Sequence, residues 1–167
     1  MRYYFEKPAA LVNKQPVKVN KENGDLAGTI IKSPAKISFF RDAKLFSNER
    51  REKQELAALT FEIAWRKGDN AAVVFHDLEN DKQLAFYEDE TSKDFLHLFT
   101  TESEFPIEII QKDTMDRITI LFHGQESAFI IIQDQQILLQ LIDENTNVPD
   151  SFFFLGYFIA ILSKIGL

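Results

Sequence analysis

The chain contains no cysteine among its 167 residues. This absence excludes a disulfide framework, a catalytic thiol and any metal site that uses cysteine ligands. A chain without cysteine also suits a reducing compartment. No apolar run of signal-peptide length follows residues 1–8, so we expect no export and a cytoplasmic location.

Glycine and proline are also scarce, with six and five residues respectively. No stretch rich in glycine, serine or proline divides the chain, so the sequence predicts one domain over residues 1–167. Hydrophobic residues make up 45% of the chain and charged residues 27%, which is the balance of a globular protein with a sizeable core.

Basic residues are outnumbered by acidic ones, and the net charge is -7. Because no basic run occurs either, nucleic acid is not expected as a partner. The charge is uneven, since residues 1–44 carry nine Lys or Arg against four acids, whereas the remainder carries ten against twenty-two. This basic first quarter indicates a face for an anionic partner, with Lys18, Lys32, Lys36 and Arg41 as candidate ligand-binding residues. The alternative is that these residues are solvated positions on alternating strands.

A hairpin is the clearest local signal. Residues 16–20 alternate apolar and polar side chains, residues 26–32 form a second strand-like run, and Asn23-Gly24 lies between the two. Asparagine and glycine both tolerate positive φ, so this spacing predicts a β-hairpin.

Further strands are predicted along the whole chain. The candidates are residues 2–7, 36–41, 60–66, 71–76, 83–87, 106–111, 117–123, 127–133 and 136–143, whereas residues 94–99 are apolar but ambiguous. Many short strands at even spacing predict an antiparallel barrel or sandwich. The charged residues 47–58 interrupt this pattern, and there we predict a short surface helix or a mobile excursion, capped by Ser47 or Asn48.

The longest hydrophobic run, residues 152–162, comes near the C-terminus and is followed by Lys164. It is too short to cross a membrane, because a spanning helix needs roughly 20 apolar residues. Asp150 or Ser151 can cap a helix here, and a helix over residues 151–165 has no polar face, so it should be buried all round. We therefore predict a mainly β fold, in which an antiparallel β-barrel wraps around a central hydrophobic helix.

Two stretches carry a resemblance to a known family. Residues 157–164 are similar to the "AFAIALSSFDSKL" ending of tubby domains at Phe158, Ile159, Ala160, Leu162 and Ser163. Residues 16–30 resemble the "V-x-D-x-x-G-x-x-x-G-x-I" opening of LURP-one-related and bacterial tubby-like proteins, with Asn20 where an Asp is common. The chain thus resembles a bacterial-type member of the tubby C-terminal-like fold, which tubby proteins, phospholipid scramblases and LURP-one-related proteins share.

Candidate catalytic residues are few. The three histidines, His76, His97 and His123, are dispersed and lack the i, i+4 spacing of a helical metal pair. The acidic stretches 77–81 and 143–147 are interpreted as turns rather than calcium loops. No phosphate loop, dinucleotide fingerprint or G-x-S-x-G elbow occurs, so we expect no metal and no cofactor.

Together with the resemblance, the sequence favours a non-catalytic binding or scaffold domain of tubby-like type. We expect it to recognise an anionic membrane surface or a protein partner and to have no transmembrane segment. The alternative is a hydrolase-like enzyme whose site is assembled from dispersed histidine, aspartate and glutamate residues. The two hypotheses differ in one structural expectation, because the enzyme needs a polar pocket that holds at least one of the histidines.

Overall fold

The computed structural model describes residues 1–8, 15–32, 44–49, 54–62, 72–100, 106–112, 116–144 and 146–165. These residues form twelve strands and one helix. The strands are β1 (Arg2–Glu6), β2 (Val17–Lys21), β3 (Leu26–Lys32), β4 (Lys44–Glu49), β5 (Glu55–Glu62), β6 (Ala72–Asp77), β7 (Lys82–Glu88), β8 (Leu96–Thr100), β9 (Ile107–Gln111), β10 (Arg117–Phe122), β11 (Gln125–Ile132) and β12 (Gln136–Leu141). The helix, α1, is Asp150–Ile165.

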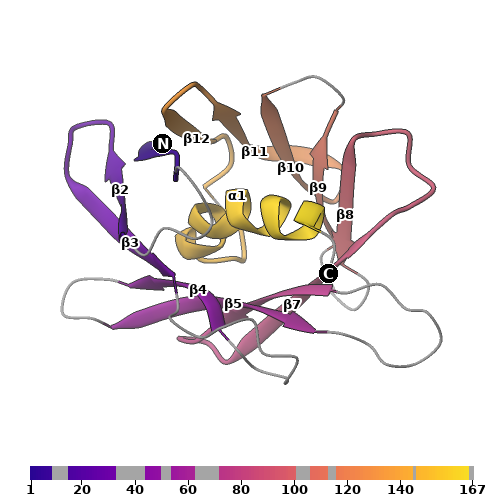
Figure 1. Ribbon diagram of the computed structural model, residues 1–167, viewed down its shortest axis with the longest axis horizontal. Coiled ribbons are helices and arrows are strands. Elements are labelled where there is room, and N and C mark those ends of the chain that lie inside the picture. Colours follow the sequence, from indigo (N-terminus) through magenta and orange to yellow (C-terminus); the bar gives the residue numbers. More distant parts are fainter. Residues whose placement is uncertain are drawn as a thin grey trace.

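The strands form one antiparallel sheet in which neighbours in sequence are neighbours in space. In addition, β1 pairs with β12 along its whole length and with β2 at Tyr3 and Tyr4. The hydrogen-bonded order β1-β12-β11-β10-β9-β8-β7-β6-β5-β4-β3-β2 therefore closes on itself. In Figure 1 the strands surround α1, which lies in the middle of the molecule.

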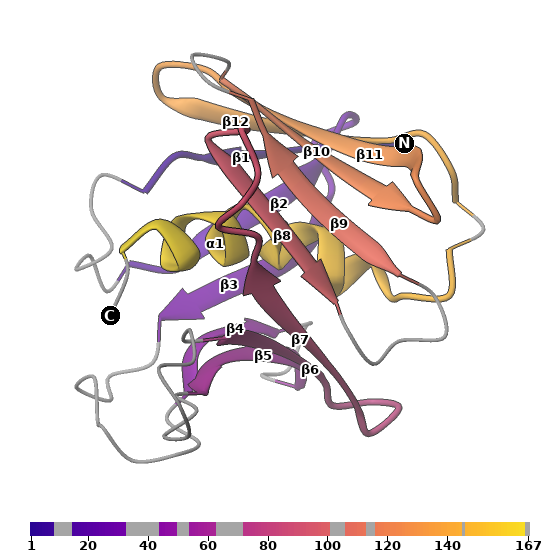
Figure 2. The same ribbon diagram turned by 90° about the vertical axis from the view of Figure 1, so that its right-hand side faces the viewer.

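This up-and-down order gives the strand ring two ends. The turns after β2, β6 and β10 lie at one end and those after β7 and β11 lie at the other, because neighbouring strands run in opposite directions. The helix begins at the first end, where Tyr3 Oη donates a hydrogen bond to Asp150. It finishes at the second, where Lys164 donates to Gln111. We call these the Asp150 end and the Lys164 end, and Figure 2 shows α1 lengthwise between them.

The predicted hairpin is confirmed by the pairing of β2 with β3. Gly24 has a φ of 88°, and its N–H donates to the carbonyl of Lys21 at 2.9 Å. Asn23 Oδ1 accepts the backbone N–H of Asp25 at 3.0 Å. The turn therefore uses the positive φ that glycine adopts without steric cost.

The helix fills the interior of the ring. Residues 151–160 are all buried, and Phe152 has no exposed surface. The Phe152 ring centroid lies 5.3 Å from that of Phe75, 5.9 Å from that of Phe86 and 6.3 Å from that of Phe122. These three partners come from β6, β7 and β10, so one side chain joins distant parts of the sheet. The prediction of a mainly β fold with a buried C-terminal helix is confirmed.

Small residues set how closely the helix meets the sheet. A Cβ atom at Gly156 would lie 3.2 Å from Cδ1 of Ile120 and 3.4 Å from Cδ1 of Ile130. Glycine at this position therefore lets the helix backbone lie against β10 and β11.

The prediction of a surface helix or a mobile excursion over residues 47–58 is wrong for the described part of that segment. Asn48 lies in β4, and residues 55–58 lie in β5 rather than in a helix. Residues 56–60 are buried, and β5 pairs with β4 on one side and β6 on the other. Pairing on both edges and burial of both faces outweigh the helix preference of this charged, alanine-rich sequence.

Other predicted elements fall partly outside the described residues. The strand predicted for residues 36–41 lies outside them, and the strand predicted for 60–66 is described as far as Glu62. The ambiguous residues 94–99 contribute to β8, which begins at Leu96. Ser151 does not cap the helix, since its Oγ is buried with no hydrogen-bond partner in the described chain. Of the helices described, none is long and apolar enough to cross a membrane.

We predict that Phe152→Ala lowers the free energy of unfolding by about 3–5 kcal/mol, because it opens a cavity beside the rings of Phe75, Phe86, Phe122 and Phe153. Phe95→Ala is the matched control, since Phe95 is 54% exposed. Its loss should cost at most about 1 kcal/mol. Urea unfolding of both variants measures the difference, and similar costs for the two would contradict a core position for the helix.

Tyr3 ties the first strand to the start of the helix. It is 1% exposed, its hydroxyl donates to Asp150 Oδ2 at 3.1 Å, and its ring packs edge-on against Phe154 with centroids 4.8 Å apart. Burial raises the pKa of Tyr3 well above its ordinary 10.0, and the Asp150 carboxylate raises it further. Burial also raises the pKa of Tyr157.

This pairing predicts a loss of stability in alkali. Above pH 10 the unfolded chain releases the Tyr3 proton while the folded chain keeps it, so the free energy of unfolding falls as pH rises. Tyr3→Phe should cost about 1–2 kcal/mol at neutral pH. It should also reduce the alkaline slope, and Tyr157→Phe should remove a further part of it. Denaturant unfolding across a pH series measures both, and an unchanged slope in both variants would overturn this assignment.

Candidate functional site

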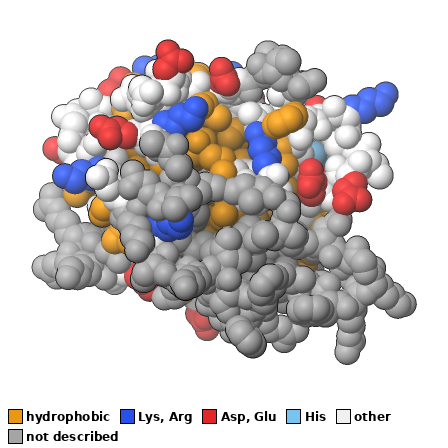
Figure 3. Space-filling view, viewed as in Figure 1, with side chains coloured by type: hydrophobic (Ala, Val, Ile, Leu, Met, Phe, Trp, Pro, Cys, Tyr) orange, Lys and Arg blue, Asp and Glu red, His pale blue; other side chains and the backbone are white. Residues whose placement is uncertain are grey.

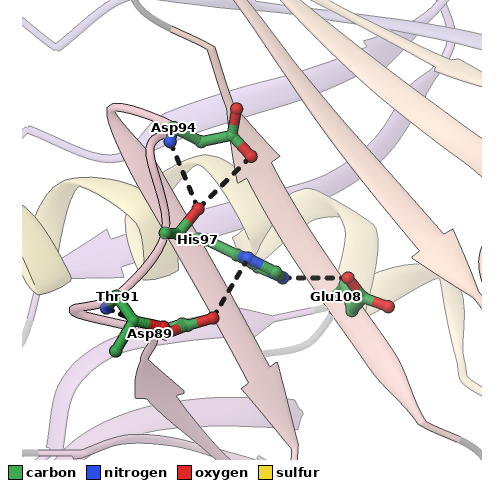
Figure 4. Close-up of polar contacts among 6 residues, drawn as sticks. Asp89, Thr91, Asp94, His97 and Glu108 are labelled. Carbon is green, nitrogen blue, oxygen red and sulfur yellow. Dashed lines mark hydrogen bonds and ion pairs between the residues drawn. The ribbon is translucent and has the colours of Figure 1, made fainter.

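His97 is the histidine with charged neighbours. In β8 the burial alternates, so Leu96, Leu98 and Thr100 point inward while His97 and Phe99 face outward. Figure 4 shows the His97 ring between two carboxylates. Its Nε2 lies 2.9 Å from Glu108 Oε2 on β9, and its Nδ1 lies 3.8 Å from Asp89 Oδ2 just after β7.

The turn between β7 and β8 holds Asp89 in place. The Asp89 Oδ1 atom accepts the backbone N–H of Thr91 at 3.0 Å and the Thr91 hydroxyl at 2.7 Å. The Asp89 backbone N–H donates to the carbonyl of His97 at 2.8 Å. Further along, the Asp94 N–H donates to Ser92 Oγ at 3.2 Å. The turn is thus fixed by its own short polar side chains.

These bonds stabilise the charged form of Asp89. The hydroxyl of Thr91 and then its backbone N–H lower the pKa of the Asp89 carboxyl below its ordinary 3.8, and His97 lowers it further. Because the pKa is lower in the folded chain, the contribution of this turn to stability is present above pH 3.8 and is lost as pH falls through the folded pKa.

We predict that Thr91→Val raises the pKa of Asp89 toward 3.8, because it removes the hydroxyl donor and leaves the backbone N–H. An NMR titration of the Asp89 carboxyl carbon measures the change. Ser92→Ala is the control, since the Ser92 hydroxyl donates to Asp94 instead. Equal pKa values for Asp89 in wild type and Thr91→Val would contradict this account of the turn.

The arrangement suits a structural clamp better than a catalytic base. Both ring nitrogens of His97 face a carboxylate oxygen, so neither nitrogen points at a site where a substrate could lie. Glu108 and Asp89 lie at opposite nitrogens of the His97 ring. The two carboxylates and one ring nitrogen therefore cannot all coordinate the same metal ion. Consistent with this, no group of three or more His, Asp or Glu side chains in the described chain is arranged to hold a metal ion.

The structure does not bring the three histidines together. His76 Nε2 lies 2.7 Å from Thr60 Oγ1 on the outer face of β5 and β6. His123 lies in the turn between β10 and β11 with a φ of 51°. His123 is therefore at the Asp150 end, whereas His97 lies on β8 beside the turn at the Lys164 end.

A second group of side chains lies where the helix ends. The ammonium of Lys164 donates to the buried side chain of Gln111 and lies 4.3 Å from the centroid of the Phe95 ring. Burial lowers the pKa of Lys164. Phe95 is 54% exposed although it is a large apolar side chain. No carboxylate in the described chain forms an ion pair with Lys164.

Two of the predicted ligand-binding residues lie at this same end. Lys18 is exposed near the start of β2, and Lys32 is half-buried at the end of β3. Lys7, which follows β1, lies at this end as well. Lys36 and Arg41 lie outside the described residues. Figure 3, which looks onto the Lys164 end, shows hydrophobic side chains near the middle of this face with Lys or Arg side chains beside them.

The Asp150 end is the more acidic of the two. The acidic side chains near its described turns and strand ends are Glu22, Asp25, Glu55, Asp77, Glu79, Asp81, Glu126, Asp143, Glu144 and Asp150, and the basic ones are Arg2, Lys21 and Lys82. At the Lys164 end acids also occur, namely Glu6 at the end of β1, the acids of residues 88–94, Asp116 and Asp134, but lysines lie among them at more positions than at the Asp150 end. The two ends therefore differ in charge.

Comparison with known proteins finds no relative. No protein-family model, no curated protein and no solved structure matches the chain significantly.

Sequence reasoning named His97 but missed its partners Asp89 and Glu108. The sequence did signal that His97 faces outward. It stands between two leucines in an alternating strand, and the leucines face inward. The partners depend on strand register, which no local pattern gave. Lys164 and Phe95 were missed for the same reason, since their contact joins residues far apart in the sequence.

Proposed function

We propose that the chain is a non-catalytic binding domain that docks on an anionic lipid surface through its Lys164 end. The observation that carries this proposal is the contact of exposed Phe95 with Lys164, at the same end of the strand ring as Lys7, Lys18 and Lys32. We further propose that the ring and its buried helix are a barrel of the tubby-like kind. The C-terminal position and complete burial of the helix core support that fold.

The chemistry of this end suits an anionic interface. Lysines near such a surface contribute about 1 kcal/mol each. An exposed aromatic ring can enter the boundary between headgroups and acyl chains. Lys164 lies against the Phe95 ring with no carboxylate ion pair in the described chain, so its charge remains available to a lipid headgroup.

Binding is a better account of the molecule than catalysis. The helix occupies the interior of the ring, where its residues 151–160 are all buried. The histidine that lies beside two carboxylates is held by both of them. The enzyme alternative needed a polar pocket that holds a histidine, whereas His97 lies on the outer wall.

Vesicle flotation tests the proposal with variants matched across the two ends. Lys18→Gln and Lys21→Gln change exposed lysines on the same strand, the first near the Lys164 end and the second at the Asp150 end. Phe95→Ser and Leu78→Ser change exposed apolar residues, which are 54% and 41% exposed, at the same two ends. We expect binding to phosphatidylserine vesicles that weakens with salt, and we expect Lys18→Gln and Phe95→Ser to weaken it most.

Three outcomes would overturn the proposal. They are no binding to anionic vesicles, equal binding to neutral phosphatidylcholine vesicles, and equal losses for the variants at the two ends. Thermal unfolding of each variant confirms that the fold is intact.

A further inference from the structure

His97 lies close to the surface that we propose for lipid docking. It follows Phe95 by two residues, so the Cα atoms of the two are at most about 7 Å apart. The His97 side chain is 20% exposed on the outer face of β8. The other two histidines, His76 and His123, lie near the Asp150 end. Histidine is the side chain that ordinarily gains or loses its charge between pH 5 and pH 8.

The turn that carries Phe95 is acidic. Residues 88–94 contain four acids and one lysine, namely Glu88, Asp89, Glu90, Asp94 and Lys93. Hydrogen bonds from Thr91 hold the pKa of the Asp89 carboxyl below its ordinary 3.8, so Asp89 keeps its negative charge in mild acid. Negative charge in this turn opposes the approach of Phe95 to an anionic surface.

The surroundings of the His97 ring favour a positive charge on it. Its Nε2 lies 2.9 Å from Glu108 Oε2 and its Nδ1 lies 3.8 Å from Asp89 Oδ2, as Figure 4 shows. A neutral imidazole carries one N–H and can donate to one of these carboxylates, whereas the imidazolium carries two and can donate to both. On the neighbouring strands, the titratable side chains on this outward face are Asp89 and Tyr87 beside β8 on one side and Glu108 on the other. None of these three is a cation in either of its forms.

We propose that protonation of His97 controls docking, so that the Lys164 end binds an anionic lipid surface more tightly in mild acid than at neutral pH. This inference rests on the proposed function and adds regulation to the same surface. A positive His97 offsets the two carboxylates that it contacts. It also places a cation within about 10 Å of Phe95, which is the Debye length at 0.1 M salt. When His97 is neutral, the same carboxylates repel the headgroups.

Vesicle flotation at pH 5.5 and pH 7.5, at one ionic strength, tests this control. The vesicles contain phosphatidylglycerol, whose phosphodiester keeps its charge over this range. We expect the wild-type chain to bind about fivefold more tightly at pH 5.5, because one added positive charge near an anionic surface has an effect of that size.

Two histidine variants identify the group responsible. His97→Gln keeps an N–H for Glu108 but cannot be protonated, so we expect it to bind equally at the two pH values. His123→Asn is the matched control at the Asp150 end, because asparagine tolerates the φ of 51° at this position. We expect His123→Asn to keep the wild-type ratio of affinities. Thermal unfolding at both pH values confirms that each variant is folded.

The outcomes separate this inference from the proposed function. An absence of binding at both pH values would overturn the two together. Wild-type binding that does not change with pH would overturn the regulation alone, and so would a change of equal size in wild type and His97→Gln. If His97→Gln does not fold, Glu108→Gln gives the second test. That variant removes one of the carboxylates that the imidazolium contacts, so the ratio should fall, and an unchanged ratio would overturn the inference.

Discussion

The burial of one apolar helix determines the rest of this structure. Because α1 has no polar face, each strand must offer an apolar side to it, and residues 151–160 are buried as a result. The same requirement explains the alternation in β8, β9 and β12, where every second residue is inward and buried. Surfaces with a binding role must then lie on the outer wall or at the two ends of the ring.

The up-and-down order of the strands brings charged residues that are scattered in the sequence to particular ends of the ring. The basic first quarter has no cluster in the sequence, yet Lys7, Lys18 and Lys32 reach the same end because the chain reverses at each turn. The helix then brings Lys164 to that end from the far end of the sequence. Among the described residues, more acids at turns and strand ends, including Glu22, fall at the other end. An up-and-down sheet can therefore separate charge in space without separating it in sequence.

Much of the fold could be predicted from sequence, and the site could not. The hairpin at Gly24 follows from a local rule on positive φ, and the helix from Asp150 follows from its capping residue and its continuous apolar run. Local rules give the wrong structure for the segment 47–58, because pairing with neighbouring strands outweighs the helix preference of its own residues. The contact of His97 with Glu108 could not be predicted for a related reason, since it depends on the register between β8 and β9. Contacts set by register cannot be read from one strand alone.

The first strand has a consequence for how the chain folds. β1 hydrogen-bonds to β12, so residues near opposite ends of the described chain, such as Arg2 and Gln140, must meet before the ring closes. Contacts so distant in sequence carry a large loop-closure cost and slow folding. Until they form, β12 and β2 each present an unpaired edge, and such edges invite pairing with other chains. The five residues of β1 thus protect two neighbouring strands from aggregation as well as completing the sheet.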